Sequence, residues 1–327
     1  SGLRTDLHGL VMAGSNLAGP ADPSSSLAVS FQAESHEIGW FTLNPFFAGD
    51  RPAVLATGEF DLADPDGMTD VAFVWHEDKT EFQEARYYLR PMLGDGLGGF
   101  TVHTPEGLGI QSLLIQENRL PGAMYAFALR RTLAQAEAGA AVPTDLIVAN
   151  RGTSDFTVFL GIGDGRFLAK YDGSLDFAVG QPPLDVAAGY LEGAFGSGAL
   201  DAGKELPDVV SLTRDGNSSV LVVSYALKPD ELQARGLEVG FEVPHAMIIY
   251  QHGGPVTLNP VPHPVALDIA DVNNDGLVDI LVLDFVRSSV LVFENHGKRN
   301  FGDPVEFFTG TQPVENSTGS AKLRFPW

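Results

Sequence analysis

Short apolar runs separated by glycine and proline make up most of the hydrophobic pattern of this chain. Runs such as 280–283 and 290–293 are flanked by turn-forming residues, and a longer one at 264–270 alternates apolar with polar positions. Alternation of this kind is typical of strands in antiparallel sheets. With 37 glycines and 21 prolines among 327 residues, the pattern predicts an all-β chain with many turns. The apolar runs are too short to cross a membrane as a helix.

One unit near the C-terminal end shows the full order of elements. An apolar strand over 263–270 leads into an acidic loop over 271–279, and two further apolar strands follow at 280–283 and 289–293. A turn then reaches Phe301. This order of strand, acidic loop, strand, turn and strand predicts one small antiparallel sheet.

Weaker copies of this unit cover the rest of the chain. The copy that opens at Val54 keeps an acidic loop and ends at Phe100, whereas the copies around 143–167 and 207–241 keep the strands and lose the loop. Residues 5–41 match a unit that begins after its acidic loop. Five units can therefore be counted.

Two markers recur with the units. An aspartate opens the second strand and a phenylalanine follows the third, each at intervals of roughly 60 to 75 residues. The aspartates are Asp6, Asp70, Asp145, Asp208 and Asp279, and the phenylalanines are Phe41, Phe100, Phe167, Phe241 and Phe301. This period predicts a β-propeller, a toroidal array of four-stranded antiparallel sheets whose radial packing buries both faces of each sheet.

The predicted ring is a single domain over residues 1–327. Its repeats cover approximately 1–48, 49–104, 105–172, 173–247 and 248–308, and residues 309–327 close the ring. The closing segment supplies the inner strand that the first unit lacks, because Gln312 and Pro313 resemble the strand opening at His263 and Pro264. Closure leaves no free sheet edge. A fragment of a six- or seven-bladed ring is the alternative to five blades.

These strands and loops resemble FG-GAP/VCBS repeats, the family of integrin α-subunit propellers and of many bacterial secreted proteins. The resemblance covers most of the chain, and the unit at 263–301 matches best. It implies calcium in the loop between the first two strands of a blade, and recognition of protein or carbohydrate by one face of the ring. The units at 143–167 and 207–241 depart from the pattern because they lack the acidic loop.

The acidic loop at 271–279 offers the oxygen ligands that calcium needs. Calcium takes six to eight oxygens, and a tight loop supplies them from alternate positions. The first, third, fifth, seventh and ninth positions are Asp271, Asn273, Asp275, Leu277 through its main-chain carbonyl, and Asp279. The alternative is an Asp/Asn/Gly turn held by hydrogen bonds from side chain to backbone.

A second calcium loop is expected before the strand that Asp70 opens. Its ligands are Asp61, Asp64, Asp66, Met68 through its carbonyl, and Asp70. Asp61 lies one residue too early for the first position, and a one-residue bulge would bring it into place. A simple turn is again the alternative. Calcium is expected to stabilise these loops, and no residue of the chain is predicted to be catalytic.

Two loops without an acidic cluster are candidate recognition loops. The segment at 130–141 is rich in alanine and predicts a short helix, and the segment at 192–205 is rich in glycine. Insertions on one face of a propeller often carry recognition, and solvated mobile loops are the alternative.

Charge and cysteine content narrow the classes of function. The chain has 20 Lys and Arg against 42 Asp and Glu, a net charge of −22, which opposes binding to nucleic acid. It has no cysteine, which excludes a disulfide framework, thiol catalysis and a thiolate metal site. No signal peptide is visible at the first residues, so by sequence alone the chain is mature, trimmed or cytoplasmic. The family resemblance implies secretion to the extracellular space or the periplasm.

The leading hypothesis for function is a secreted, calcium-stabilised interaction module that binds a protein or a glycan through one propeller face. An alternative is an enzyme on a propeller scaffold, a lyase or hydrolase of polysaccharide. That alternative requires paired titratable groups in one pocket, and no repeat-breaking constellation in the sequence supplies them. A third hypothesis is a structural subunit of a larger assembly, which predicts a broad apolar patch on one face.

Overall fold

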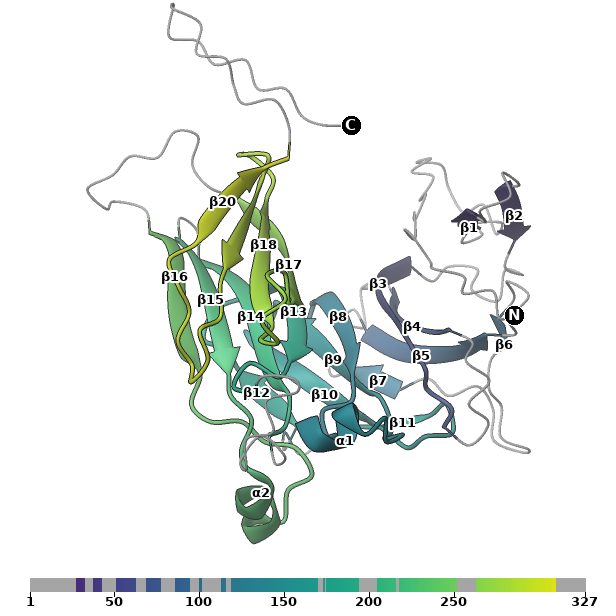
Figure 1. Ribbon diagram of the computed structural model, residues 1–327. Helices are drawn as coiled ribbons and strands as arrows, with labels where there is room; N and C mark the ends of the chain where they lie inside the picture. The colour runs from purple at the N-terminus through teal and green to yellow at the C-terminus, as the bar shows by residue number, and fades with distance from the viewer. Residues whose placement is uncertain are drawn as a thin grey trace, which may run out of the picture.

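The computed structural model consists of antiparallel sheets with two short helices (Figure 1). The residues that the structure describes are 28–32, 38–42, 51–62, 69–77, 86–94, 100–101, 113–115, 119–169, 173, 175–193, 205–215, 218–251 and 263–309. No helix in this described part is long and apolar enough to cross a membrane.

Four sheets follow one another along the chain. The first contains β3 (Arg51–Gly58), β4 (Asp70–Glu77), β5 (Arg86–Gly94), β6 (Phe100–Thr101) and β7 (Leu113–Ile115). The second contains β8 (Pro121–Phe127), β9 (Asp145–Asn150), β10 (Asp155–Gly161), β11 (Phe167–Leu168) and β12 (Asp176–Ala178). The third contains β13 (Pro183–Gly189), β14 (Asp208–Asp215), β15 (Ser218–Ser224) and β16 (His245–Gln251). The fourth contains β17 (Pro264–Ala270), β18 (Asp279–Asp284), β19 (Ser289–Phe293) and β20 (Val305–Phe308).

Each sheet is a meander in which neighbouring strands pair antiparallel in chain order. In the first two sheets the outermost strand comes in two short pieces, because β6 and β7 both pair with β5, and β11 and β12 both pair with β10. A separate hairpin joins β1 (Ala28–Gln32) to β2 (Ile38–Thr42). The prediction of an all-β chain built from four-stranded antiparallel units is confirmed for these four sheets.

The first strands of the four sheets lie side by side. Strand β3 packs against β8, β8 against β13, and β13 against β17, so the sheets fan outward from a common line of inner strands (Figure 1). Each inner strand has a proline followed by a shift in register, and these prolines are Pro52, Pro121, Pro183 and Pro264. Proline donates no ladder hydrogen bond and is tolerated at bulges, which bend the strand. The recurrence makes the four sheets structural repeats.

Apolar side chains from alternate strand positions fill a separate core on each side of an inner sheet. In β9, Leu146 and Val148 belong to the core shared with the first sheet, whereas Ile147 and Ala149 belong to the core shared with the third. All six residues of β9 are buried. Each fully buried large aliphatic side chain contributes about 1.5–3 kcal/mol. Packing of this kind holds one sheet against the next and fixes the loops at their ends.

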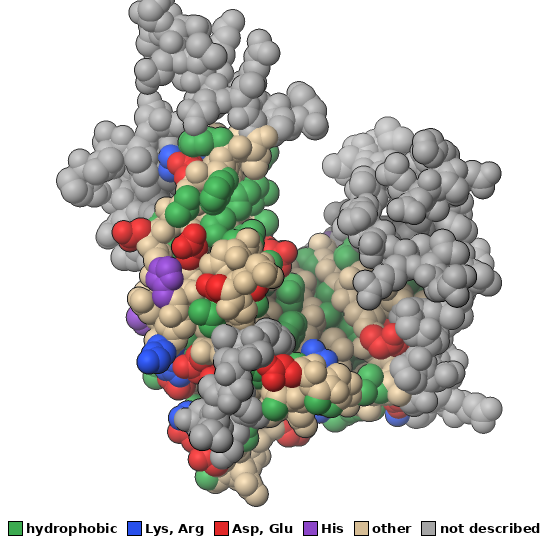
Figure 2. Space-filling view, in the orientation of Figure 1, with side chains coloured by type: hydrophobic (Ala, Val, Ile, Leu, Met, Phe, Trp, Pro, Cys, Tyr) green, Lys and Arg blue, Asp and Glu red, His purple; other side chains and the backbone are tan. Residues whose placement is uncertain are grey.

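The fourth sheet presents one apolar face to solvent. Leu283, Val290 and Phe307 are in register across β18, β19 and β20, on the face opposite the core shared with the third sheet. Leu283 is 41% exposed and Phe307 is 55% exposed. Figure 2 shows hydrophobic side chains gathered on this sheet. The described sheets form an open arc, and no closed ring is present among them.

The two helices lie in connections between strands. The helix predicted within 130–141 is α1 (Leu133–Glu137), which begins at a capping box formed by Thr132 and Gln135. Helix α2 (Pro229–Arg235) was not predicted from the strand pattern. Its sequence does carry helix signals, because Pro229 is the first helical residue and Gly236 follows the helix with φ of 65°.

Candidate functional site

An aspartate at the start of the second strand of each sheet ties together two neighbouring loops. One carboxylate oxygen accepts a hydrogen bond from a main-chain N–H in the loop before that strand, and the other accepts one from an N–H at or after the end of the third strand. For Asp70 the donors are Phe60 (2.7 Å) and Gly94 (2.9 Å). The other sets are Leu129 (3.1 Å) and Gly161 (2.9 Å) for Asp145, Leu191 (3.2 Å) and Ala226 (2.8 Å) for Asp208, and Val272 (3.1 Å) and Asn295 (2.8 Å) for Asp279. All four aspartates are at most 2% exposed.

The recurring phenylalanine meets this aspartate through one shared residue. Gly94, Gly161, Ala226 and Asn295 each donate to the aspartate and each pair with the phenylalanine, which is Phe100, Phe167, Phe241 or Phe301. The two sequence markers are therefore two sides of one structural contact. The prediction that the aspartate opens the second strand is confirmed for these four sheets. Asp6 lies outside the described residues, and Phe41 lies in β2.

Strand register defines equivalent positions in the four loops between first and second strands. We name these loops A (59–69), B (128–144), C (190–207) and D (271–278). The last residues of the first strands, Gly58, Phe127, Gly189 and Ala270, pair with the four aspartates. The first loop positions are therefore Glu59, Ala128, Tyr190 and Asp271, and the third are Asp61, Arg130, Glu192 and Asn273. In this register Glu59 holds the first position of loop A and Asp61 holds the third.

Loop D is shaped by its own side chains. The Asp271 carboxylate accepts hydrogen bonds from the N–H groups of Asn274 (2.6 Å), Asp275 (3.2 Å) and Gly276 (2.9 Å). The Asp275 carboxylate accepts one from Leu277 N–H (2.8 Å). Asn274 and Gly276 have positive φ, 61° and 88°, which the tight turn requires. These contacts match the turn alternative, and they leave the side chains at 271–275 exposed to solvent.

The predicted ligands of loop D are oxygen donors of the kind that calcium needs. Their oxygen atoms do not converge on one point. Asn273 Oδ1 accepts a hydrogen bond from Asp275 N–H (2.9 Å), and the Asn273 amide donates to the Asp275 carboxylate (3.0 Å). Asp279 is buried at the end of the loop and accepts its two main-chain bonds. Among the described residues, the carboxylates of Asp271, Asp275 and Asp279 do not form a group within 4.8 Å of one another.

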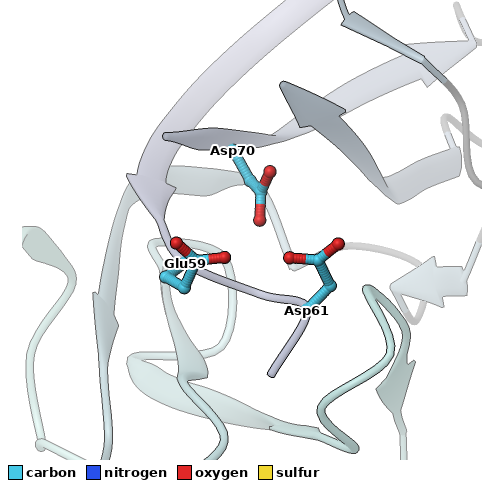
Figure 3. Close-up of side chains that lie close together, drawn as sticks. All are labelled: Glu59, Asp61 and Asp70. Atoms are coloured by element: carbon cyan, nitrogen blue, oxygen red, sulfur yellow. The ribbon is translucent and has the colours of Figure 1, made fainter. Parts of the chain in front are cut away.

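Loop A brings three carboxylates together. Ligand oxygens of Glu59, Asp61 and Asp70 lie within 4.8 Å of one another, and Figure 3 shows the three side chains turned toward a common point. Asp61 Oδ1 is buried and accepts no hydrogen bond from the described residues. Carboxylates this close repel one another, and a divalent cation between them would offset the repulsion. Asp64, Asp66 and Met68 lie outside the described residues.

Sequence reasoning missed Glu59 as a member of this group. Loop A is longer than loop D, so the spacing of acidic residues in loop D does not reach the first position of loop A. The signal that identifies Glu59 is the pairing of Gly58 with Asp70, which matches the pairing of Ala270 with Asp279. Glu59 therefore corresponds to Asp271, the first predicted ligand of loop D.

Loop B carries a cationic side chain at its third position. The Arg130 guanidinium donates to both oxygens of Asp145, with Nη2 to Oδ1 at 2.6 Å and Nε to Oδ2 at 3.3 Å, and it also donates to the Gly161 carbonyl. Asp145 is fully buried. Burial raises the pKa of Asp145 to about 6, against the opposing effect of Arg130 and the two main-chain donors.

Loop C receives a cation from the next sheet. Arg299, in the turn after β19, binds Glu192 through Nε at 2.5 Å and Glu242 through both Nη atoms at 2.7 and 2.8 Å. Its guanidinium lies 4.1 Å from the centroid of the Tyr225 ring. Burial raises the pKa of Tyr225 to about 12. Burial also raises the pKa of Asp208 to about 8, and the charge of Glu192 adds to that rise.

Loops B and C contact each other at this end of the sheets. Leu133 at the start of α1 donates its N–H to the Glu205 carbonyl (2.8 Å), and the Tyr190 hydroxyl donates to the Arg131 carbonyl (2.8 Å). The two segments predicted as recognition loops, 130–141 and 192–205, therefore adjoin. Of the second segment, residues 194–204 lie outside the described residues.

A polar cluster joins β9, β10 and β12 to the segment before β8, around the buried Arg119. Its guanidinium binds Asp176 at 2.6 Å and Asp155 at 3.2 Å, and it donates to Thr157 at 2.8 Å. Asn150 donates to Asp155 (2.7 Å) and Thr157 (2.9 Å). Because the charges here are paired with one another, this cluster fixes the strands to one another.

Comparisons with known proteins give weak guidance. The sequence matches no protein-family model and no curated protein. Among solved structures, one match is a lectin from Agrocybe aegerita, described as recognising non-reducing terminal N-acetylglucosamine. That similarity covers 92% of this chain and 80% of the lectin chain at 15% sequence identity, with a TM-score of 0.34. A similarity at this level transfers neither fold nor ligand.

Proposed function

We propose that this protein is a secreted interaction module whose sheet-connecting loops are stabilised by calcium and whose loop surface binds a protein or a glycan. The observation that carries the proposal is the group of Glu59, Asp61 and Asp70, whose carboxylates lie within 4.8 Å of one another at the position equivalent to the acidic loop D. Oxygen donors at this spacing suit a hard divalent cation. Calcium would bind the folded loops and leave the unfolded chain unbound, which stabilises the fold by mass action.

In loop A the calcium ligands would be Glu59, Asp61 and Asp70, joined by the predicted Asp64, Asp66 and Met68. In loop D they would be Asp271, Asn273, Asp275, Leu277 through its carbonyl, and Asp279. The carboxylates of Asp271 and Asp275 accept hydrogen bonds from main-chain N–H groups of loop D. Binding there would require Asp271 and Asp275 to turn from those N–H groups toward the ion.

The binding surface of this proposal is the joined pair of loops B and C. Helix α1 presents exposed positions such as Gln135 and Glu137, and hydrogen bonds to the Glu205 and Arg131 carbonyls hold the two loops together. A surface held on a rigid set of sheets loses little entropy on binding, which favours recognition. The buried aspartates beneath it are occupied by main-chain donors, which favours a structural role for them over catalysis.

The proposed architecture is a five-bladed ring with the repeat boundaries predicted above. A fifth sheet built from residues 1–48, with an inner strand from 309–327, would cover the apolar face of the fourth sheet. Two features support it. The face at Leu283, Val290 and Phe307 has the character of a sheet core. In the sequence, Pro313 follows Gln312 in a segment that resembles the strand opening at Pro264. A structural subunit of a larger assembly would instead cover this face with another chain.

Thiol labelling distinguishes these two coverings, because the chain has no cysteine of its own. If the face is covered, the cysteine of Phe307→Cys should be labelled more slowly than that of Val243→Cys. Position 243 is 89% exposed and serves as the reference. If the fifth sheet covers the face, the slow rate is independent of protein concentration and deletion of residues 1–48 abolishes it. A rate that falls with rising concentration points to a second chain, and equal rates for the two variants contradict the ring.

Ligand recognition is tested by screening the folded protein against a glycan array and against extracellular protein extracts, each in calcium and in chelator. We expect binding in calcium that is lost when a Gly/Ser linker replaces residues 133–139. The control replaces the α2 segment 229–236, a surface helix outside loops B and C, and should retain binding. Turnover of a polysaccharide in place of stable binding would favour the enzyme alternative. Binding that survives loss of α1 would remove loop B from the surface.

A further inference from the structure

The third position of the loops carries a cation in one sheet and a ligand residue in others. Arg130 in loop B is equivalent to Asp61 in loop A and to Asn273 in loop D, because the strand register before each loop is the same. A positive side chain therefore occupies the position that holds an oxygen donor in loops A and D. The element that recurs beneath all three loops is the buried aspartate, which is Asp145 in loop B.

Arg130 contacts the same kinds of oxygen that a hard cation would take. Its guanidinium reaches both carboxylate oxygens of Asp145 and one main-chain carbonyl, that of Gly161. The Arg130 side chain is 23% exposed, whereas the Asp145 side chain that it binds is fully buried. A charge-assisted, two-pronged contact of this type is among the stronger polar contacts in proteins. The site in loop B is therefore closed by the chain itself.

Loop C reaches a similar result by another route. Arg299 comes from the following sheet and binds Glu192, the third-position residue, together with Glu242. The guanidinium also covers the ring of Tyr225, which is 3% exposed. The cationic side chain at loop C therefore belongs to the next repeat and reaches loop C through the packing of the two sheets.

We propose that Arg130 and Arg299 are built-in cations that take the place of calcium in loops B and C, so that calcium uptake is confined to loops A and D. This inference rests on the proposed calcium function for its ion count, although the role of Arg130 stands on its contacts with Asp145 and Gly161. It explains why the two middle repeats lack acidic loops and still keep the buried aspartate. It also predicts that removing the arginine and restoring the carboxylates would create a calcium site.

Calcium bound per chain, counted by equilibrium dialysis with metal analysis, tests the inference. The wild-type chain should bind two ions. The double variant Ala128→Glu/Arg130→Asp copies the loop A trio into loop B and should bind three. Arg235→Asp, which makes the same change of charge as Arg130→Asp but on the exposed end of α2, should stay at two. Three or four ions in the wild type, or no gain in a folded double variant, would overturn the inference. Arg130→Asp alone is the second variant if the double variant does not fold, and it should gain a weaker third ion.

A second arm in chelator separates this inference from the proposed function. Arg130→Ala leaves Asp145 buried without its cation and should lower the melting temperature by about 5 °C or more at pH 7.5. The loss should shrink at pH 5, where Asp145 can bind a proton, and Arg130→Lys should restore part of it. A wild-type chain that binds no calcium but shows this pattern refutes the calcium function and keeps Arg130 as a built-in cation. An Arg130→Ala chain that melts like the wild type at both pH values refutes the role of Arg130.

Discussion

Loops A and B occupy equivalent places in adjacent sheets and satisfy a buried aspartate in opposite ways. In loop A, Asp70 lies within 4.8 Å of Glu59 and Asp61, so negative charge accumulates at one point. In loop B, Asp145 is bound by Arg130 and no other acidic side chain joins it among the described contacts. The backbone frame is the same in both, since each aspartate accepts two main-chain hydrogen bonds. The difference teaches that this repeat keeps the aspartate as a structural acceptor and varies the charge of the side chains around it.

The largest loss of stability is expected when Asp145, the buried aspartate of loop B, is removed. Asp145→Ala leaves two buried main-chain N–H groups without an acceptor and Arg130 without a partner, so it should lower the free energy of unfolding by about 3–5 kcal/mol. Denaturant unfolding measures this directly. Asp303→Ala, at an exposed position outside the loops, is the control and should change stability little. A loss in Asp145→Ala no larger than that of the control would mean that the aspartate is dispensable.

Loop C is an intermediate case, because Arg299 binds Glu192 and Glu242 but does not bond Asp208 directly. Burial raises the folded-state pKa of Asp208 to about 8, from an ordinary value of 3.8. A raised pKa contributes stability that is fully present below the unfolded value and is lost as pH rises through the folded value. The wild type should therefore lose about 2–3 kcal/mol between pH 5 and pH 7 from this group alone.

Asp208→Asn should remove this contribution and flatten the pH dependence over the same window. The comparison is made on unfolding free energies at pH 5, 6 and 7, with Asp303→Asn as a matched change of charge at the surface. Equal slopes for the wild type and Asp208→Asn would show that Asp208 titrates normally.

Neutralising Asp61 in loop A should change the free energy of unfolding in opposite directions in chelator and in calcium. Asp61→Asn relieves repulsion, so in chelator it should raise the free energy of unfolding by about 0.5–1 kcal/mol. In saturating calcium the same change removes a ligand and should lower it by about 1–2 kcal/mol. Asp230→Asn, at an exposed acidic position in α2, should show no such reversal of sign. A change of the same sign in both conditions would argue against a cation between Glu59, Asp61 and Asp70.

A small effect is also expected at Arg299, where the bridges are partly exposed. Arg299→Ala removes contacts with Glu192 and Glu242, whose side chains are 28% and 38% exposed, and solvent screening limits the loss to about 1 kcal/mol. The pKa of Glu242, which the bond to Arg299 lowers, should return toward its ordinary value. Carboxyl chemical shifts followed against pH would detect this change. A Glu242 titration that is the same in both chains would contradict the assigned contact.

The sequence predicted the framework of the fold better than the chemistry of the loops. The strand pattern and the two markers located the repeat, because alternation and turn residues are local properties of the chain. Asp145 and Asp208 were identified as strand openers without any acidic loop to support them, and both are buried at those places. Their role as acceptors linking two loops depends on main-chain donors up to 18 residues away, which local pattern does not reveal.

The contacts that define each loop could not be predicted from the sequence, for a physical reason. Arg130 lies 15 residues from Asp145, and Arg299 lies 107 residues from Glu192, so both ion pairs are made by the packing of strands and sheets. Glu59 needed the strand register, because the longer loop A conceals its equivalence with Asp271. The helix α2 is different, since Pro229 and Gly236 mark its ends in the sequence and were outweighed by the strand pattern.

The most direct test of calcium-stabilised loops is a thermal melt of the wild-type chain in calcium, in magnesium and in chelator. We predict a melting temperature that rises with calcium concentration, rises little with magnesium, and falls in chelator, because the ion binds only the folded loops. Asp275→Ala and Asp61→Asn should each lose part of the calcium-dependent rise, and Asp303→Ala should keep all of it. A wild-type melting temperature that is the same in calcium and in chelator would contradict the account.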